Sequence, residues 1–550
     1  MAETPLQDDQ PEEHEHSAVL DSAHVGDIHG AFGTIREHDL DSRRSWTARL
    51  LTLAAIMGPG LIVMVGDNDA GGVATYSQAG QNYGLSLLWV LPLLIPVLVV
   101  NQEMVVRLGA VTGVGHARLI NERFGRFWGA FSVGDLFILN FLTIATEFIG
   151  VSLALDYFGV SKYWSVPLAA IGLVVMTASG SFRRWERFMF VFIIVNFLVI
   201  PLAFTSHPSA SAFFAGLTTP GVQGGFNSTS VLLVIAIVGT TVAPWQLFFQ
   251  QSNIVDKRIT PRWINYERAD TVLGSLITVF AAAIMMAVVA SAFAGTAFFG
   301  HFTNAGGVAT GLQHVVGRAA GALFALILLN ASIIGAASVT LSTSYAFGDV
   351  FGAHHSLHRG WRDAKFFYGA FTAMVVVAAG IVLIPGAPLG LITTGVQALA
   401  GVLLPSATVF LLLLCNDKQV LGPWVNRLWL NILSSVIVSI LLAMSLVLMI
   451  TTLFTSVNVT LLAEALGGVL LVTYAVAAVL LVRNRSRREP TPVVPMERKA
   501  TWRMPQLSLL ERPTWSKTRL IGMWGLRIYL LVAVLLLAVK AIELGFHHGG

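Results

Sequence analysis

The chain has 550 residues, 55% of them hydrophobic and 12% charged, with a formal net charge of +4 and a mean hydropathy of +0.72. This composition excludes an ordinary soluble domain and predicts a protein that crosses a lipid bilayer many times. The one cysteine, Cys415, excludes an internal disulfide and a thiolate metal cluster.

The segments follow one another in a simple order. Residues 1–45 are polar with little apolar periodicity, which predicts a disordered cytoplasmic tail. A transporter core is expected over 46–455, an additional span over 456–482, a basic cytoplasmic linker over 483–524 and a C-terminal span over 525–550. Runs long enough to cross a bilayer number about thirteen. They lie near 50–80, 86–107, 130–157, 164–180, 187–205, 229–251, 270–298, 319–345, 366–385, 389–415, 429–454, 460–482 and 525–545.

Loop charge indicates the orientation. With the N-terminus inside, the cytoplasmic loops receive nearly all of the loop arginines and lysines, whereas the outer loops hold little more than Lys162 and Arg318. Positive loops mark the cytoplasmic side, so we expect a multi-pass protein of the cell inner (plasma) membrane with a cytoplasmic N-terminus. The linker 483–524 should lie along anionic lipid, which makes membrane lipid an expected partner and nucleic acid not.

Two of the apolar runs are broken. The stretch 58–80, GPGLIVMVGDNDAGGVATYSQAG, carries Asp67 and Asp69 among glycines and a proline, and the stretch 239–252, GTTVAPWQLFFQQS, is interrupted by Pro244. Carboxylates at membrane depth persist where they face a cavity, a partner or an ion. Broken helices expose backbone carbonyls to a cation, so the pattern predicts a pair of discontinuous transporter helices. They lie five spans apart, as two repeated halves require.

These stretches resemble the NRAMP (natural resistance-associated macrophage protein) family of divalent-metal transporters. The resemblance continues through 145–155, 265–274, 321–329 and 396–407 and covers about 50–450. It implies an all-α polytopic membrane protein with a LeuT-like fold of two inverted five-helix repeats. It also implies that helices 1 and 6 are unwound and that a metal site lies between them.

The signature motifs depart from the family in an informative way. The family's Asp-Pro-Gly-Asn reads DAGG here, so Asp69 keeps the carboxylate and Gly72 replaces the amide. The family's Met-Pro-His reads APW, with Ala243 and Trp245 in place of the thioether and the imidazole. A thioether favours soft transition metals, whereas a wider, oxygen-lined site suits partly hydrated Mg²⁺. The pattern is similar to that of the NRAMP-related magnesium transporters, which implies Mg²⁺ and also Mn²⁺ as transported ions and no cofactor.

The resemblance also bears on proton coupling. In coupled members the third helix carries an aspartate three residues before a glutamate. Here Glu147 keeps the glutamate position, but Ile144 occupies the aspartate position and Trp245 that of the sixth-helix histidine. Neither side chain can relay a proton, so uncoupled transport is expected, driven by the ion gradient and the membrane potential.

Four carboxylates are candidates for the metal site. Asp69 is the first candidate, as a direct or water-mediated ligand, against a purely structural role. Asp67 either adds a second negative charge that attracts the ion or caps the unwound segment. Glu147 either enlarges the negative field or bonds a neighbouring helix, and Glu103 is a lone intramembrane carboxylate without a family counterpart.

Uncharged residues complete the candidate set. Gln246 supplies an outer-shell amide or satisfies broken-helix backbone, and Gln397 approaches the metal or packs helices through its amide. Gly66 and Thr240 offer backbone carbonyls by analogy with the family. The predicted metal-site residues are Asp69, Gly66, Gly72, Thr240, Ala243, Gln246 and Gln397, with Asp67, Glu147, Trp245 and Glu103 as further candidates.

Other polar residues are given structural interpretations. Glu267 and Arg268, at a cytoplasmic helix start, are interpreted as a gating or structural ion pair. The histidines His354, His355 and His358 are interpreted as surface residues of a loop.

Three rival functions fit the sequence less well. A proton-coupled Mn²⁺ or Fe²⁺ importer is disfavoured by the lost motif side chains, although Mn²⁺ also accepts oxygen ligands. A passive cation channel is disfavoured because two matched broken helices are typical of alternating access. An enzyme is not expected, since the sequence has no nucleotide loop, no catalytic Ser-His pair and no HExxH motif.

Overall fold

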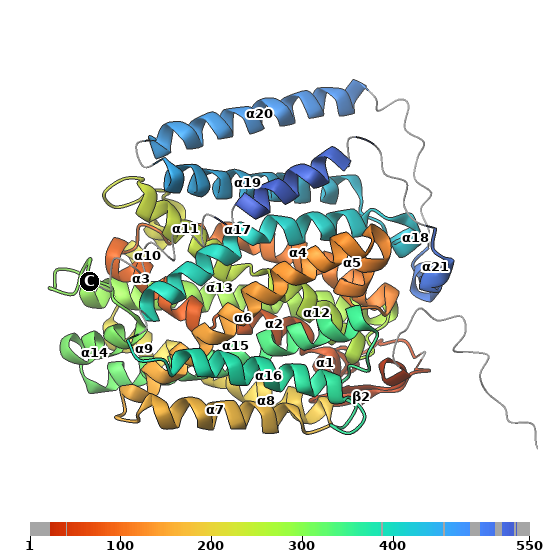
Figure 1. Cartoon of the computed structure of the whole chain (residues 1–550), viewed down its shortest axis with the longest axis horizontal. Coiled ribbons are helices and arrows are strands. Elements are labelled where there is room, and N and C mark those ends of the chain that lie inside the picture. Colours follow the sequence, from red (N-terminus) through yellow and green to blue (C-terminus); the bar gives the residue numbers. More distant parts are fainter. Residues whose placement is uncertain are drawn as a thin grey trace, which may run out of the picture.

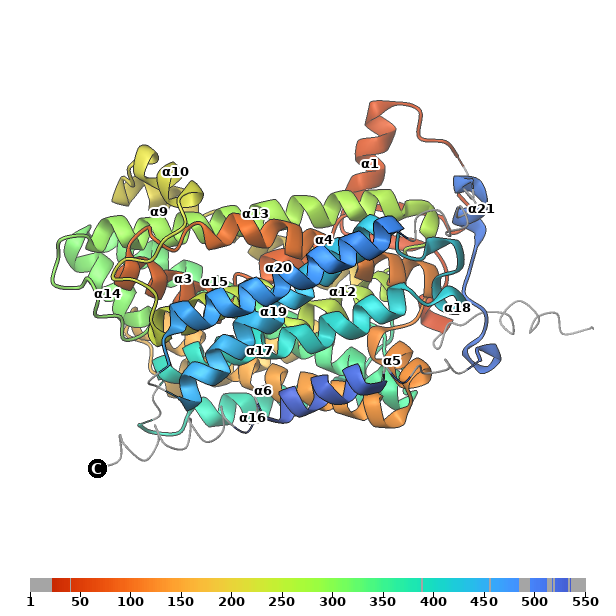
Figure 2. The same ribbon diagram turned by 90° about the horizontal axis from the view of Figure 1, so that it is seen from above.

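The computed structural model describes residues 22–39, 41–386, 389–454, 457–483, 495–511, 517, 520–532 and 535. Over these ranges the chain is a bundle of long helices with a two-stranded hairpin near its N-terminal side (Figures 1 and 2). The expected all-α polytopic fold is confirmed.

The first half contains one 3₁₀ turn, the hairpin and ten helices. They are η1 (Ser22–His24), β1 (Ile28–Gly30), β2 (Gly33–Ile35), α1 (Trp46–Ile56), α2 (Pro59–Gly66), α3 (Ala70–Tyr83), α4 (Val90–Thr112), α5 (His116–Phe124), α6 (Arg126–Asp156), α7 (Lys162–Thr177), α8 (Phe182–Asn196), α9 (Val199–Ser206) and α10 (Ala210–Thr218).

The second half and the C-terminal part follow the same helical pattern. Their elements are α11 (Ser228–Thr241), α12 (Pro244–Asp256), η2 (Pro261–Trp263), α13 (Ile264–Phe293), α14 (Ala305–Val315), α15 (Arg318–Phe351), α16 (Lys365–Val382), α17 (Leu389–Cys415), α18 (Lys418–Leu421), η3 (Gly422–Trp424), α19 (Leu428–Leu453), α20 (Val459–Arg483), α21 (Met496–Thr501) and η5 (Leu507–Leu509).

Two spans are broken where the sequence predicts it. The first is interrupted between Gly66, the end of α2, and Ala70, the start of α3. The second is interrupted between Thr241 and Pro244, which opens α12 because proline lacks the N–H that a continuous helix would need there. The unwound helices 1 and 6 are therefore confirmed.

The packing of the half-helices matches two inverted repeats. The half-helix α2 packs against α13, the second span of the other repeat, and the half-helix α12 packs against α4, the second span of the first. Each broken helix thus reaches across to the partner repeat, which is the arrangement expected for a LeuT-like fold.

Fewer helices qualify as spans than the sequence suggests. In the described part of the chain, ten helices are long and apolar enough to cross a membrane, or up to eleven if the bent pair α1 and α2 counts as one. The expected total of about thirteen also includes the runs near 164–180 and 525–545, where the described helices, α7 and Leu520–Val532, are apolar but shorter. Most of the expected C-terminal span 525–545 lies outside the described residues after 532.

One pair of helices touches backbone to backbone. A Cβ at Gly239 in α11 would overlap the backbone of Gly401 in α17, and a Cβ at Gly401 would lie 2.6 Å from the carbonyl oxygen of Ile235. Small residues permit this approach, as is common between membrane helices.

The bundle has a basic end, which we define by Arg183, Arg187, Lys257 and Arg258. The hairpin and α1 lie there, and Figure 2 shows α18 and α21 at the end of the bundle where α1 projects, with α10 and α14 at the opposite end.

The predicted disordered tail is wrong for residues 22–39. They form η1 and the hairpin because β1 and β2 pack on α1, and β1 also packs on α8. Residues 1–21 lie outside the described residues.

Part of the predicted linker is described by the structure. Residues 495–511 contact the helical bundle, since Trp424 Nε1 donates to the Lys499 carbonyl at 2.9 Å and Arg123 donates to the Glu511 carbonyl at 2.6 Å; their position along lipid stays a prediction.

Candidate cation site at the two helix breaks

Asp69 begins α3. Its Oδ1 accepts a hydrogen bond from the Gly72 N–H at 2.7 Å, which caps the helix because the first turn has no intrahelical acceptor for that group. Asp69 is 2% exposed, so the carboxylate is held inside the bundle. A structural role of Asp69 is therefore real, and it stands beside the predicted role as a ligand.

Gly72 provides room for other groups rather than a wider cavity. A Cβ there would lie 2.9 Å from the Asp67 carbonyl and 3.2 Å from Thr240 Oγ1. The extra space that the sequence suggests at Gly72 is thus filled by protein in this conformation. Thr240 Oγ1 is buried and has no hydrogen-bond partner among the described residues.

Asp67 lies in the break itself and is fully buried. Its Oδ1 accepts a hydrogen bond from Gln246 Nε2 in α12, so one amide links the two broken helices. Gln246 Oε1 in turn accepts from Gln102 Nε2 in α4 at 3.0 Å. The second oxygen of Asp67, Oδ2, has no hydrogen-bond partner in the described part of the protein. A buried carboxylate oxygen without a donor is a strong acceptor for a cation or for a cation's water.

Glu147 reaches the same break from α6. Its Oε2 accepts from the Ala70 N–H at 3.1 Å, at the start of α3. A Cβ at Gly335 in α15 would meet both the Glu147 carboxyl group and Asp69 Cβ, which places these two acids side by side. Glu147 therefore lies at the first helix break, with one oxygen that no described donor satisfies.

The side chains at the replaced motif positions are apolar and buried. Ala243 is the residue before α12 and is 4% exposed. The Trp245 ring lies against Gly66, where a Cβ would be 3.4 Å from the indole, and Ile144 is fully buried. None of these side chains can bind a cation through a heteroatom lone pair or carry a proton at neutral pH.

Gln397 approaches from α17. The position of a Cβ at Gly71 would be occupied by its amide, so Gln397 touches the first turn of α3. Its Nε2 is buried without a described acceptor. The amide thus lies close to the capped end of α3.

The site as a whole offers oxygen atoms from several helices. Across the described residues, no three Asp, Glu, His or Cys side chains converge closely enough to hold a metal ion directly. The buried acceptors without a described donor are separate oxygens on Asp67, Asn68, Glu147 and Thr240. Separate hard ligands around a cation suit contact partly through its water molecules.

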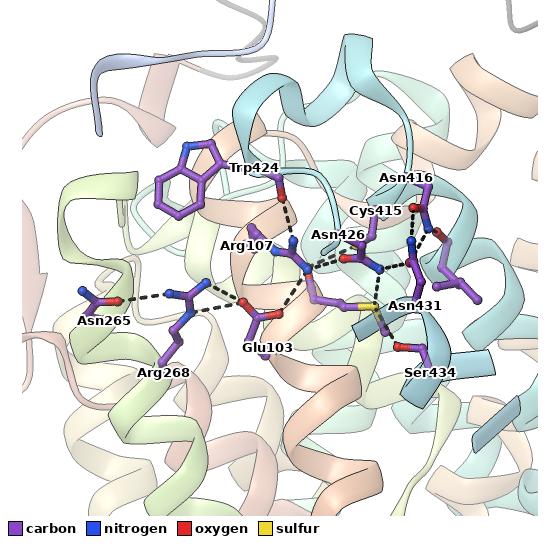
Figure 3. A network of polar contacts seen from close by, with 12 residues as sticks. Glu103, Arg107, Asn265, Arg268, Cys415, Asn416, Trp424, Asn426, Asn431 and Ser434 are labelled. Atoms are coloured by element: carbon purple, nitrogen blue, oxygen red, sulfur yellow. Dashed lines mark hydrogen bonds and ion pairs between the residues drawn. The ribbon is translucent and has the colours of Figure 1, made fainter. Parts of the chain in front are cut away.

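Glu103, a further candidate, belongs elsewhere. Figure 3 shows it between Arg107 and Arg268, with Oε2 at 3.1 Å from Arg107 Nη2 and Oε1 at 2.5 Å from Arg268 Nη2. Arg107 also donates to the Trp424 carbonyl and to Asn426 Oδ1, each at 2.6 Å. The interpretation of Glu103 as a lone intramembrane carboxylate is wrong, because Arg107 and Arg268 both pair with it.

Two other interpretations need correction. Arg268 pairs with Glu103 rather than with Glu267, whose carboxylate is fully buried and has no described hydrogen-bond donor. His355 is 3% exposed rather than on the surface, and its Nε2 lies 3.1 Å from Asp349 Oδ1. Burial alone would lower the pKa of His355. The contact with Asp349 and the neighbouring groups outweighs this effect and raises the pKa to about 8.

Sequence reasoning missed two polar residues of the site. Gln102 holds Gln246, and Asn68 donates from Nδ2 to the Thr278 carbonyl at 3.1 Å while its Oδ1 has no described partner. The polar triplet Asn101, Gln102 and Glu103 inside an apolar run was a signal for the first. Asn68 lies between Asp67 and Asp69, and its uncharged amide gives no separate signal in the sequence.

Comparison with known proteins decides the family. Residues 60–451 match the Nramp family, described as natural resistance-associated macrophage protein-like. The chain belongs to this family. Relatives of this Nramp protein include the divalent metal cation transporter MntH of Xylella fastidiosa, 27% identical over 450 residues that cover 78% of this chain and 90% of that protein. The MntH of Bacillus subtilis is 26% identical over 414 residues, which cover 73% of this chain and 93% of the relative.

Solved structures support the fold of this Nramp protein. The Eremococcus coleocola manganese transporter in complex with an aromatic bis-isothiourea compound aligns with a TM-score of 0.57 and 20% identity, over 81% of this chain and 97% of that one. A variant of the same transporter aligns with a TM-score of 0.59 and 19% identity, over 84% and 98%. These likenesses bear on the architecture alone.

Proposed function

We propose that this Nramp protein is a secondary transporter that moves divalent metal cations by alternating access, with Mg²⁺ as its main cargo and Mn²⁺ also carried. The observation that carries the proposal is the donor set at the two helix breaks. Carboxylate, hydroxyl and amide oxygens line it, and Ala243 stands at the motif position of the thioether. Hard oxygen donors favour Mg²⁺ and Mn²⁺ over softer transition metals.

The ion keeps part of its water. Asp67 Oδ1 already accepts a hydrogen bond from Gln246, and Asp69 Oδ1 accepts one from the Gly72 N–H. The free oxygens of Asp67 and Glu147 therefore meet the ion mainly through water, which Mg²⁺ gives up reluctantly. Movement of the half-helices provides the width for these waters, since the closed arrangement is filled by protein.

Transport is not coupled to protons. Buried Ile144 and Trp245 occupy the positions where coupled members carry an aspartate and a histidine, and neither titrates. The membrane potential alone supplies about 4.6 kcal/mol for a divalent ion at 100 mV, twice the figure for one charge. With the N-terminus and the basic end in the cytoplasm of an inner-membrane protein, this force drives import.

Uptake into proteoliposomes tests the proposal. The vesicles carry a Mg²⁺-sensitive and a pH-sensitive dye, and the wild type is compared with Ala243→Met, with Ala243→Leu as the control for side-chain bulk. We expect the wild type to admit Mg²⁺ and Mn²⁺ without acidification. The thioether of Ala243→Met should shift the preference toward Cd²⁺ relative to Ala243→Leu. Entry of Mn²⁺ alone, with acidification of the lumen, would instead identify a proton-coupled transition-metal importer.

A further inference from the structure

The N-terminal hairpin is built onto the moving part of the expected transport cycle. Gly30 and Gly33 lie directly on α1, where a Cβ at Gly30 would overlap the Ala55 carbonyl and a Cβ at Gly33 would lie 2.9 Å from Ala55 Cβ. Figure 1 shows β2 beside α1 at the same edge of the bundle as α8. Glycine at these positions allows the hairpin to touch the α1 backbone.

Helix α8 binds the hairpin through hydrogen bonds that involve three charged residues. Arg183 Nε donates to the Gly30 carbonyl at 3.1 Å, and Arg187 Nε donates to the Ala31 carbonyl at 2.9 Å. Between the two arginines, Glu186 Oε2 accepts from the Ala31 N–H at 2.5 Å. Hydrogen bonds to charged groups are the stronger class, so the hairpin is firmly attached to α8.

The same glutamate reaches the broken helix. Glu186 Oε1 pairs with Lys257 Nζ at 2.5 Å, and both side chains are fully buried. Lys257, just after α12, also donates to the carbonyls of Ile56 at 2.7 Å and Met57 at 2.9 Å. Hairpin, α8, α12 and the junction between α1 and α2 are thus joined through one buried ion pair.

The start of α2 is held from its other side by α13. Asp270 Oδ2 accepts from the N–H groups of Gly58, Gly60 and Leu61, at 3.0, 2.8 and 3.1 Å. Gly58 has a φ of 153°, and a Cβ there would overlap the Glu186 carboxyl group. The junction therefore cannot move away from α13 without breaking its contacts to Asp270, and it cannot move away from α12 without breaking those to Lys257.

The first turn of the hairpin segment is anchored as well. Arg258 donates to the Ala23 carbonyl at 2.9 Å and to the Asp27 carbonyl at 3.1 Å. His24 Nε2 lies 3.1 Å from the His355 carbonyl oxygen in the loop after α15. The segment is therefore bound both to Arg258, which follows α12, and to the loop that follows α15.

We infer that residues 22–35 are a latch that holds the basic end closed and must release before α2 can swing away from α13. The inference rests on the proposed alternating access, because that cycle supplies the movement. The latch acts through Glu186 and Lys257, which transmit its attachment to the α1–α2 junction. It makes the N-terminal segment an inhibitory element of the transporter itself.

Cysteine accessibility tests the latch in the full-length protein. Ser275→Cys is the reporter, because Ser275 is fully buried on α13 and its Oγ lies 3.3 Å from Met64 Sδ in α2. The chain without the reporter is the blank, since its one cysteine, Cys415, is buried. Maleimide labelling is followed in mild detergent without divalent ions, so the result does not depend on which ion is carried.

The arginines of α8 offer a matched pair of variants. Arg183→Ala with Arg187→Ala removes two side chains that bind the hairpin. Arg184→Ala removes the same kind of charge from an exposed neighbour whose side chain makes no hydrogen bond to the hairpin among the described residues. We expect the double variant to label about tenfold faster than the parent, a change of about 1.4 kcal/mol in the opening equilibrium. Arg184→Ala should label like the parent.

A second variant guards against misfolding. Gly30→Ala places a Cβ into the Ala55 carbonyl and should also speed labelling, with exposed Glu37→Ala as its control. Equal labelling rates in the folded disrupting variants and their controls would overturn the latch and leave the magnesium proposal standing. Faster labelling of the disrupting variants, in a protein that does not transport Mg²⁺, would support the latch and refute the proposal that Mg²⁺ is the transported ion.

Discussion

Replacing Asp69 separates its two roles. Asparagine caps a helix about as well as aspartate, so Asp69→Asn should change the free energy of unfolding by no more than a few tenths of a kcal/mol, whereas Asp69→Ala should cost about 1 kcal/mol. The charge matters far more to the ion. Two unit charges about 4 Å apart interact by about 4 kcal/mol at an effective dielectric constant near 20, hence about 8 kcal/mol for a divalent ion before its dehydration. If a quarter survives as net affinity, Asp69→Asn weakens binding about thirtyfold.

The assay pairs denaturant titration in mild detergent with Mg²⁺ uptake for both variants. We expect both to transport poorly, with Asp69→Ala alone destabilised. Should Asp69→Asn transport like the wild type while Asp69→Ala fails, the carboxylate serves as a helix cap and the reasoning about ion binding is refuted.

Three further outcomes follow from buried groups. Gln246→Leu should destabilise the protein by about 2–3 kcal/mol without divalent ions, because Asp67 loses its donor, and added Mg²⁺ should narrow the gap in a denaturant titration; an equal gap with and without Mg²⁺ would contradict this. Lys257→Met should cost about 3–5 kcal/mol, since Glu186 is left buried and unpaired, and Glu186→Gln in the same chain should recover part of it. The pKa of His355 is about 8 in the fold and about 6.5 unfolded, so its contribution of about 2 kcal/mol is full below pH 6.5 and is lost as pH rises through 8; His355→Gln should flatten the stability curve across that window.

The sequence was sufficient for the helix breaks. Pro244 and the glycines around Asp67 leave few conformations other than an interrupted span, and buried carboxylates there point to a cation. Local chemistry determines the breaks without any tertiary contact, whereas the cation site stays a prediction.

Contacts between distant elements could not be predicted. Glu103 finds Arg268 at a separation of 165 residues, and the Asp67 carboxylate finds Gln246 at 179. Residues 22–39 have little apolar periodicity of their own and are ordered by α1 and α8. Their structure follows from a docking surface that only the assembled bundle provides, which is why composition predicts disorder there.

The backbone contact between Gly239 and Gly401 bears on how the site changes shape. Two helices in direct main-chain contact have no side chains between them that could rearrange, so α11 and α17 are expected to travel as one rigid strut. Thr240 and Gln397 would then keep a constant separation throughout the cycle. The ion would then be bound and released by movement of the other groups of the site relative to α11 and α17.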